Sequence, residues 1–205
     1  MSGEHRDYES PPMEPADVDP DPIAQFRRWL DDARAAGLVE PEAMTVSTTA
    51  PAARVVLLRG VDDRGFAFFT NYESAKAREL AADPAVALSF VWLPLHRAVR
   101  VAGRAERLPE AESDAYFASR PRGSRVGAWA SPQSEVIADR AALDVEVAAV
   151  EARFDGRDIP RPPHWGGFLV RPRALEFWQG RPNRLHDRLR YRRENGGWLL
   201  ERLAP

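Results

Sequence analysis

Residues 54–71, RVVLLRGVDDRGFAFFTN, decide the fold class of this chain. Two runs rich in Val, Leu and Phe, 54–60 and 65–71, flank a polar tip, and such runs are typical of β-strands. The pattern predicts a hairpin with the four-residue tip VDDR, 61–64. Further short strands and a few helices surround it, which favours a closed or split β-barrel in an α+β, mainly β fold with flanking helices.

The other strands are predicted where apolar runs are bounded by Gly, Pro, Asn or Asp. They are MTVSTT (44–49), AVALSFVWL (85–93), RAVRVAGRAERL (97–108), WGGFLVRPRALEFWQG (165–180) and LRYRRENGGWLLERLAP (189–205). Gly103 permits a bulge, and Asn195-Gly196-Gly197 predicts a turn. A doubly wound parallel sheet is not indicated, because the GxGxxG and GxxxxGKS/T phosphate loops are both absent.

Four helices are predicted, at 21–37, 74–84, 109–121 and 138–154. The first begins with Asp21 as N-cap and Pro22 at the first helical position. Ser74 is the predicted N-cap of the second. Between the last two helices, SRPRGSRVGAWASPQS (119–134) is predicted to be irregular.

The composition excludes several classes of protein. The chain has 205 residues, of which 44% are hydrophobic and 29% charged, as in a globular domain. A net charge of -2 gives no reason to expect a nucleic-acid partner. With no cysteine, disulfides and thiol catalysis are excluded. No membrane span or secretory signal is evident, so we expect a cytoplasmic location and no membrane partner.

Residues 1–20 are acidic and proline-rich, with Arg6 as their one basic residue. Such a segment buries too little apolar area to offset its ordering entropy. We therefore predict a mobile arm at 1–20 and a single domain at 21–205.

Only one of the 29 basic residues, Lys76, is a lysine. A compact ammonium fits where a guanidinium fork does not, so Lys76 could have a specific task. Chance retention explains it equally well on composition alone.

No metal site or hydrolase centre is indicated. The four histidines lack metal-binding spacing, and GxSxG is absent. Anion binding by dispersed side chains remains, because without a glycine-rich loop a phosphate is held by converging Arg, Lys and hydroxyl groups. The candidates are Arg54, Arg59, Lys76, Arg120, Ser124, Gln133, Ser134, Arg184 and Arg188. Taken singly, each is more simply a solvated surface residue.

The combination of motifs resembles the pyridoxine (pyridoxamine) 5′-phosphate oxidase family, from about residue 21 to the C-terminus. The resemblance is carried by RVVLLRG, FFTNYESAK, YFASRPRGSRVGAWASPQS, WGGF, EFWQGRPNRLHDR and the terminal ERLAP. It implies an FMN-binding split barrel and a homodimer with FMN between the subunits. It also implies oxidation of pyridoxamine or pyridoxine 5′-phosphate to pyridoxal 5′-phosphate, with O2 reduced to H2O2.

Roles for individual residues follow from the resemblance alone. It implies FMN contacts from Arg54, Val55, Val56, Leu57, Leu58, Arg59, Phe69, Thr70, Lys76, Gln133, Ser134, Trp178 and Arg188. The implied substrate-binding residues are Arg59, Tyr116, Arg120, Ser124, Arg184, Leu185 and His186, with Arg6 and Tyr8 in the arm as a lid. Arg184 and His186 are the implied catalytic pair. Structural interpretations remain for Trp178, as a core residue, and for His186, as a partner of Asp187.

The chain departs from the family pattern at several points. Arg59 replaces a usual lysine, Ala75 an arginine, and Ala98 a glutamine that contacts the flavin ring; the loop TAPAAR is also shorter. The lost Ala98 hydrogen bond costs about 0.5–1.5 kcal/mol, so we expect somewhat weaker FMN binding than in a typical member.

Three alternatives stay open. They are a flavin oxidase of the same fold acting on another substrate, of the phenazine-pathway type; a non-catalytic binder of FMN or pyridoxal phosphate; and a deazaflavin-dependent reductase, which leaves RLHDR unexplained.

Overall fold

The computed structural model describes residue 8, residues 10–50 and residues 52–205. The strands are β1 (Ala43–Thr48), β2 (Ala53–Leu57), β3 (Gly60–Asp62), β4 (Gly65–Asn71), β5 (Ala85–Trp92), β6 (Arg97–Arg107), β7 (Trp165–Gln179), β8 (Asp187–Glu194) and β9 (Gly197–Leu203). The helices are α1 (Pro22–Ala35), α2 (Ala75–Ala82), α3 (Glu110–Ser119), α4 (Arg122–Ala130) and α5 (Arg140–Arg153), with short 3-10 turns η1 (Leu93–Leu95) and η2 (Pro182–Arg184).

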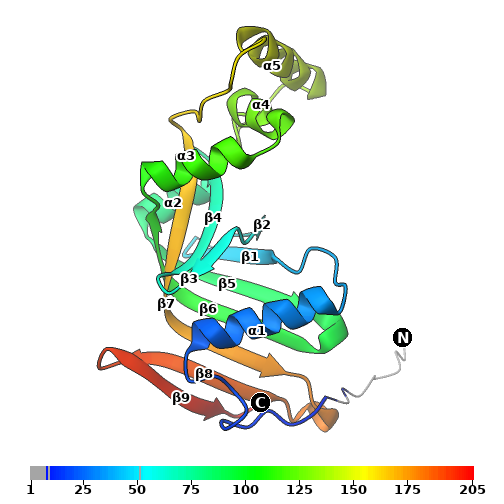
Figure 1. Ribbon diagram of the computed structural model, residues 1–205, viewed down its shortest axis with the longest axis vertical. Helices are drawn as coiled ribbons and strands as arrows, with labels where there is room; N and C mark the ends of the chain where they lie inside the picture. Colours follow the sequence, from blue (N-terminus) through cyan, green and yellow to red (C-terminus); the bar gives the residue numbers. More distant parts are fainter. Residues whose placement is uncertain (1–7, 9, 51) are drawn as a thin grey trace.

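One curled antiparallel sheet organises the described residues (Figure 1). Its main path runs β2-β1-β5-β6-β7-β4-β3, with β8 and β9 added beside β7. The long strand β7 forks the sheet, because its first half pairs with β4 and its second half with β8, while β6 runs along its other edge. The expected mainly β, α+β fold with flanking helices is confirmed.

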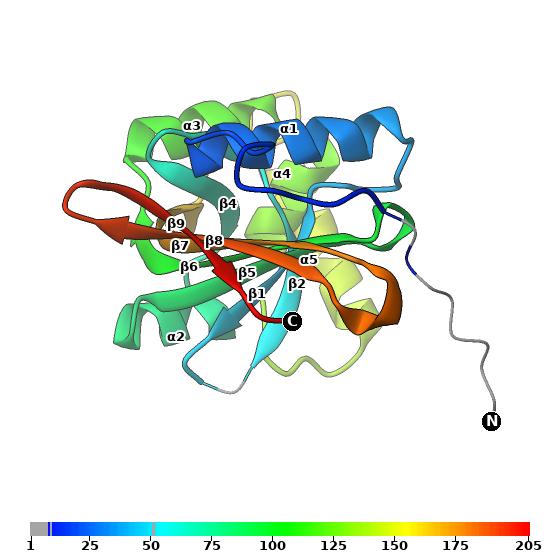
Figure 2. The same cartoon turned by 90° about the horizontal axis from the view of Figure 1, so that it is seen from below.

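Helix α1 covers one side of the sheet (Figure 2). Asp21 caps it by accepting hydrogen bonds from the amides of Ile23 and Ala24, as its sequence predicts. The fully buried Phe26 packs edge-on against Phe66, with the ring centroids 4.8 Å apart. This aromatic core explains why the two apolar runs that flank the polar tip are strands.

The predicted hairpin is wrong in its pairing. Its first run divides into β2 and β3, and only β3 pairs with β4, around a tip shorter than predicted. Strand β2 pairs with β1 instead and lies at the end of the main path. The run is interrupted between β2 and β3 at Leu58, whose side chain is buried in the core. Before this residue the chain pairs with β1, and after it with β4.

The segment predicted to be irregular, 119–134, contains α4. Val126 and Ala130 of that helix are buried against Phe117 and Phe154, and this tertiary packing outweighs the low helix propensity of its two glycines. The bulge at Gly103 is confirmed as a shift of the β6–β7 register between Ala102 and Gly103.

Part of the predicted arm contacts the body of the protein. Met13 is buried, and its amide donates to a carboxylate oxygen of Asp187 at 3.1 Å. The Tyr191 hydroxyl donates to the carbonyl of Asp19. The mobility of residues 1–20 stays a prediction. No helix in the described part of the chain is long and apolar enough to span a bilayer.

Candidate functional site

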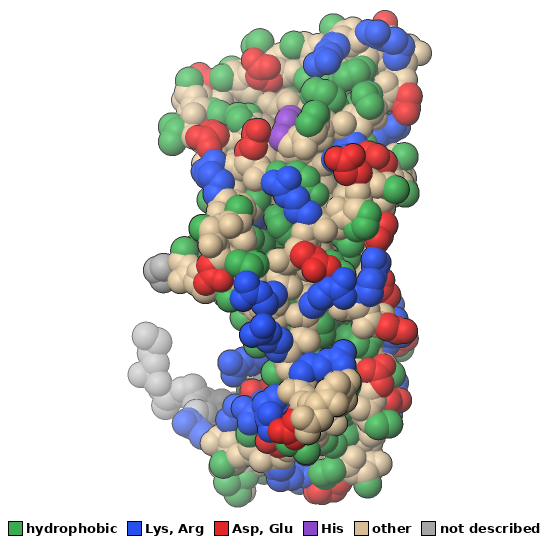
Figure 3. All heavy atoms as spheres, turned by 90° about the vertical axis from the view of Figure 1, so that its left-hand side faces the viewer, with side chains coloured by type: hydrophobic (Ala, Val, Ile, Leu, Met, Phe, Trp, Pro, Cys, Tyr) green, Lys and Arg blue, Asp and Glu red, His purple; other side chains and the backbone are tan. Residues whose placement is uncertain are grey.

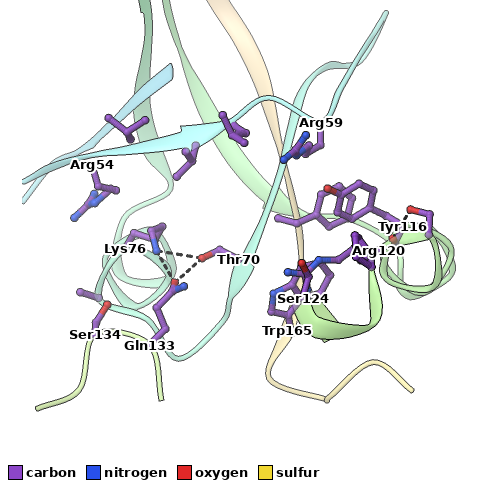
Figure 4. Close-up of a pocket in the computed structure, with 17 residues that line it drawn as sticks. Arg54, Arg59, Thr70, Lys76, Tyr116, Arg120, Ser124, Gln133, Ser134 and Trp165 are labelled. Atoms are coloured by element: carbon purple, nitrogen blue, oxygen red, sulfur yellow. Dashed lines mark hydrogen bonds between the residues drawn. The ribbon is translucent and has the colours of Figure 1, made fainter. Parts of the chain in front are cut away.

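A cavity of about 610 Å3 opens between β2, β4, the start of α2 and the α3–α4 corner (Figure 4). It gathers thirteen of the residues predicted to bind cofactor or substrate: Arg54, Val55, Val56, Leu57, Arg59, Phe69, Thr70, Lys76, Tyr116, Arg120, Ser124, Gln133 and Ser134. Strand β2 forms one wall. One edge of β2 pairs with β1, and the other edge has no strand partner among the described residues. Val55 of this strand is 71% exposed.

Lys76 lies at one end of the cavity, on the first turn of α2. Its Nζ donates to Gln133 Oε1 at 2.7 Å, to Thr70 Oγ1 at 3.1 Å and to Ser74 Oγ at 3.3 Å. Burial lowers the pKa of Lys76, and the charge of Arg54 lowers it further. The lone lysine is therefore held by neutral oxygens in a place where its charge is costly, which favours the specific task over chance retention. Ser74 precedes the helix, but its hydroxyl donates to the Asn71 carbonyl instead of capping α2.

Arg54 lies at the same end as Lys76 and is tethered. Its Nη2 donates to Glu79 Oε2 at 2.8 Å, and Thr48 Oγ1 donates to the same oxygen at 2.6 Å. The Thr48 hydrogen bond and the Arg54 guanidinium lower the pKa of Glu79. Glu79 thus holds the Arg54 side chain in place and also neutralises part of its charge.

The opposite end of the cavity holds Arg59, Tyr116, Arg120 and Ser124 (Figure 4). Many arginines of the molecule are ion-paired, such as Arg64 with Glu112 at 2.8 Å, and Figure 3 shows basic and acidic side chains interspersed on one face. Neither Arg59 nor Arg120 forms an ion pair within the described residues.

The buried Nη1 of Arg120 has no hydrogen-bond partner among the described residues. Burial lowers the pKa of Arg120, and the charge of Arg59 adds to that effect. Buried polar atoms are almost always satisfied, and guanidinium nitrogens bind anions strongly. This end of the cavity is therefore suited to bind an anion.

Trp165, a cavity residue for which the sequence motifs predict no role, lies beside this end. It begins β7 in the motif WGGF. The sequence signal that marks this place is the pair of glycines after Trp165, which indicates close packing. A Cβ at Gly166 would lie 2.2 Å from the Tyr72 hydroxyl oxygen, and one at Gly167 would lie 2.8 Å from Phe69 Cε1. Only glycine leaves room for both rings.

A second group of predicted residues lies outside this cavity. Trp178 and His186 have ring centroids 4.7 Å apart, and Tyr8 packs 5.8 Å from His186 and 4.5 Å from His96. The Arg181 amide donates to His186 Nδ1 at 3.1 Å, so neutral His186 carries its proton on Nε2. The chain segment 178–186 that carries Trp178 and His186 lies far from α3 and α4 in Figure 1.

The remaining predicted residues are placed as follows. Arg184 ends η2, and its φ of 62° is a left-handed backbone conformation that is uncommon outside glycine. Leu185 follows η2 and is 68% exposed. Arg188 donates to Glu176 Oε1 at 2.8 Å. Leu58 packs in the core, outside the cavity. Arg6 lies outside the described residues.

Two of the departures from the family pattern have clear positions. Ala75 lines the cavity beside Lys76. Ala98 is paired with Trp178 across strands β6 and β7, so it belongs to the second group.

Comparisons with known proteins agree with one another. The profile of the family described as pyridoxamine 5′-phosphate oxidase matches residues 30–154, and that of the pyridoxine 5′-phosphate oxidase C-terminal dimerisation region matches residues 165–205. A curated protein of Salinibacter ruber, named pyridoxine/pyridoxamine 5′-phosphate oxidase, is 58% identical over 92% of this chain and 91% of its own length. A protein of the same name from Thermosynechococcus vestitus is 58% identical over 98% and 96%.

Two solved structures share the fold. PhzG from Burkholderia lata 383, in complex with tetrahydrophenazine-1-carboxylic acid, superposes with a TM-score of 0.89 at 32% identity over 98% of this chain and all of that one. An FMN-binding protein related to pyridoxamine 5′-phosphate oxidase, from Nostoc punctiforme, gives a TM-score of 0.69 at 19% identity over 88% and 97%. The expected split-barrel fold is confirmed.

Proposed function

The chain belongs to the pyridoxine/pyridoxamine 5′-phosphate oxidase family, and from that membership we propose the reaction that its cavity performs. The protein is an FMN-dependent oxidase that converts pyridoxamine 5′-phosphate and pyridoxine 5′-phosphate to pyridoxal 5′-phosphate. Dioxygen is the electron acceptor and leaves as hydrogen peroxide.

The observation that carries this proposal is the presence of two cationic ends in one cavity. Lys76 and Arg54 lie at one end, and Arg59 and Arg120 at the other (Figure 4). FMN and the substrate each carry a phosphate, so a site for both ligands needs two separate anion-binding groups. The donor set therefore fits one phosphate at each end.

The residues around Lys76 fit the FMN phosphate. Lys76 supplies a compact charge, and Gln133 and Ser134 lie beside it at the mouth of the cavity. Strand β2 offers its backbone and the exposed Val55 to the flavin. FMN, when bound, accepts the hydride equivalent from the substrate and passes the electrons to dioxygen.

At the other end, Arg59, Tyr116, Arg120 and Ser124 would hold the substrate phosphate. Gripping the phosphate away from the reacting carbon turns binding energy into orientation of C4′ over the flavin. That phosphate would give Arg120 Nη1 the hydrogen-bond partner that the described residues do not supply.

The second group of predicted residues would complete the site from the partner subunit. The match to a C-terminal dimerisation region supports a homodimer. Within one chain, Trp178, Arg184, His186 and Arg188 do not reach the cavity. We therefore place FMN at the subunit interface, where Trp178 and Arg188 of one protomer would contact the flavin bound by the other, and Arg184 and His186 would orient the substrate amine or alcohol.

Tyr8 and residues of the arm would cover the site. Tyr8 already packs against His186, so closure of this segment would exclude water from the reacting atoms. The cytoplasmic location expected from the sequence stays a prediction.

The test is oxygen uptake by the FMN-loaded protein given pyridoxamine 5′-phosphate, with unphosphorylated pyridoxamine as control. We expect oxygen uptake and pyridoxal 5′-phosphate formation with the phosphorylated substrate, and a much lower rate at equal concentration without the phosphate. Equal rates with both substrates would contradict the phosphate assignment. FMN-loaded protein that consumes no oxygen with either substrate would indicate the non-catalytic binder.

The similarity to PhzG favours one second candidate, an oxidase of a phenazine precursor. Such a substrate, like the tetrahydrophenazine-1-carboxylic acid named with that structure, carries a carboxylate and no phosphate. Inhibition of the oxidase reaction by pyridoxal 5′-phosphate and by phenazine-1-carboxylate, measured side by side, distinguishes the two candidate functions. Inhibition by the carboxylate at lower concentration would support the second candidate.

A further inference from the structure

The guanidinium of Arg120 lies over an aromatic ring, whereas most of the described arginines are ion-paired with a carboxylate. Its Cζ lies 4.6 Å from the centroid of the Trp165 ring and 5.5 Å from that of Phe117. We propose that Trp165 is a positioning residue that holds Arg120 in place for the substrate phosphate. The proposal rests on the function proposed above.

The Trp165 ring is part of an ordered stack along the cavity wall. Its plane lies within 5° of Tyr116 and within 12° of Phe69, and the Phe69 and Tyr116 centroids are 3.9 Å apart. Phe117 packs edge-on against Trp165 at 5.1 Å. With neighbours on several sides, the indole has little freedom to turn, so it presents a fixed face to Arg120.

The backbone of Trp165 is also fixed. Its carbonyl accepts a hydrogen bond from Arg161 Nη1 at 2.7 Å, and the Arg161 Nε donates to Asp114 of α3 at 2.6 Å. The Trp165 amide donates to the carbonyl of Pro162 at 3.0 Å. The first residue of β7 is thereby tied to the helix that precedes Arg120.

The two ends of the cavity use opposite means to hold an arginine. Arg54 is held by the carboxylate of Glu79, which occupies guanidinium hydrogens and offsets the positive charge. A ring face instead attracts the cation through its quadrupole, leaving the N–H groups at the edge of the guanidinium free for a ligand and its charge intact. Support by Trp165 therefore suits Arg120 to bind a phosphate dianion.

The test is a double-mutant cycle in the FMN-loaded protein, with Trp165→Leu, Arg120→Gln and the double variant. Two quantities are measured for each: the KM for pyridoxamine 5′-phosphate, and the Kd for pyridoxal 5′-phosphate by calorimetry. We expect Trp165→Leu to raise both about ten-fold, an effect between those of an exposed and a fully desolvated cation–π interaction, with kcat much less affected. In the Arg120→Gln background, Trp165→Leu should add little, because the residue it acts through is gone.

Trp129 offers a matched control. Arg153 lies over its ring at 4.7 Å, and Trp129 is partly buried against the same cluster as Trp165 but does not line the cavity. Trp129→Leu should leave the KM and the Kd unchanged even if it lowers the melting temperature. Trp165→Phe keeps a smaller ring; we expect it to fold and to raise the Kd by about three-fold, and it replaces Trp165→Leu in the cycle if the leucine variant does not fold.

The outcomes separate the inference from the proposed function. Unchanged phosphate binding in the Trp165 variants, or an equal loss with and without Arg120, would overturn the positioning role while leaving the oxidase proposal intact. If Arg120→Gln itself leaves the KM and the Kd unchanged, the substrate end of the cavity is wrongly assigned, and both fall together. A loss of affinity that disappears in the Arg120→Gln background supports the inference.

Discussion

Lys76 combines a local energetic cost with a proposed role in binding an anion. It is the single lysine of the chain. Burial lowers its pKa, and among the described residues only neutral oxygens accept its hydrogen bonds. A charge kept in such a place without a carboxylate partner destabilises the empty protein and is available to an anion. The stability of the empty protein and its affinity for FMN should therefore respond in opposite directions when Lys76 is replaced.

We predict that Lys76→Met weakens FMN binding by about 10- to 100-fold, the worth of a hydrogen bond to a charged group. Quenching of flavin fluorescence measures the Kd, and riboflavin, which lacks the phosphate, is the control ligand. Riboflavin binding should change little. An equal loss for both ligands would mean that Lys76 does not contact the phosphate.

The same substitution should change how the stability of the FMN-free protein depends on pH. Because the folded pKa of Lys76 lies below its ordinary value of 10.5, the unfolded chain binds the proton more tightly. The free energy of unfolding of the wild type therefore rises with pH between those two values. Lys76→Met should be the more stable protein at pH 7, and its advantage should shrink as the pH approaches 10 in thermal melts. An advantage independent of pH would contradict this.

At the scale of elements, the start of β7 sets the shape of the cavity wall. Gly166 and Gly167 lie against the rings of Tyr72 and Phe69, and Phe69 in turn lines the cavity. Both positions are ordinary β-strand residues with negative φ, so space alone requires glycine there. The motif WGGF thus has a packing explanation that does not depend on ligand contact.

We predict that Gly167→Ala destabilises the protein by about 1–3 kcal/mol through overpacking against Leu108 and Phe69. FMN affinity should fall as well, because Phe69 must shift. Gly127→Ala in α4 is the control; an added methyl meets nothing there, so it should be neutral or slightly stabilising. Urea unfolding and FMN titration of both variants check this. A Gly167→Ala protein as stable as wild type would show that the wall yields without cost.

At the scale of the whole molecule, the predicted site residues fall into two separated groups. One group lines the cavity. The other belongs to the segment around η2, which lies at the opposite end of the molecule from α4 and α5 (Figure 1). Within the described part of the chain, one edge of strand β2 has no strand partner beside the cavity, where another subunit could approach. The proposed site therefore needs two chains.

Hybrid dimers test this arrangement. Arg120→Gln impairs the first group and Arg184→Ala the second, so each homodimer should have low activity at limiting substrate. Random reassociation of equal amounts makes half of the dimers hybrids, each with one intact site of two, and should restore roughly a quarter of the wild-type activity. Activity no higher than the mean of the two parents would show that each site is built from one chain.

Local pattern was enough for most elements of the fold. The Asp21-Pro22 helix start, the Gly103 bulge and the turn after β8 follow from capping, backbone freedom and turn chemistry, which act within a few residues. The pairing of β2 with β1, and the helix α4, were missed because the choice of partner depends on contacts between residues distant in sequence.

By itself, the sequence determined the fold class, the family and which residue types could bind two phosphates, since motif and composition are properties of the chain. Only the tertiary structure decided which of those residues share a cavity and that Trp178 and His186 lie elsewhere. It also decided that Arg120 lies over the Trp165 ring with its Nη1 unpartnered among the described residues. The physical reason is that burial and convergence are set by how distant strands pack, and neither quantity exists in a linear pattern.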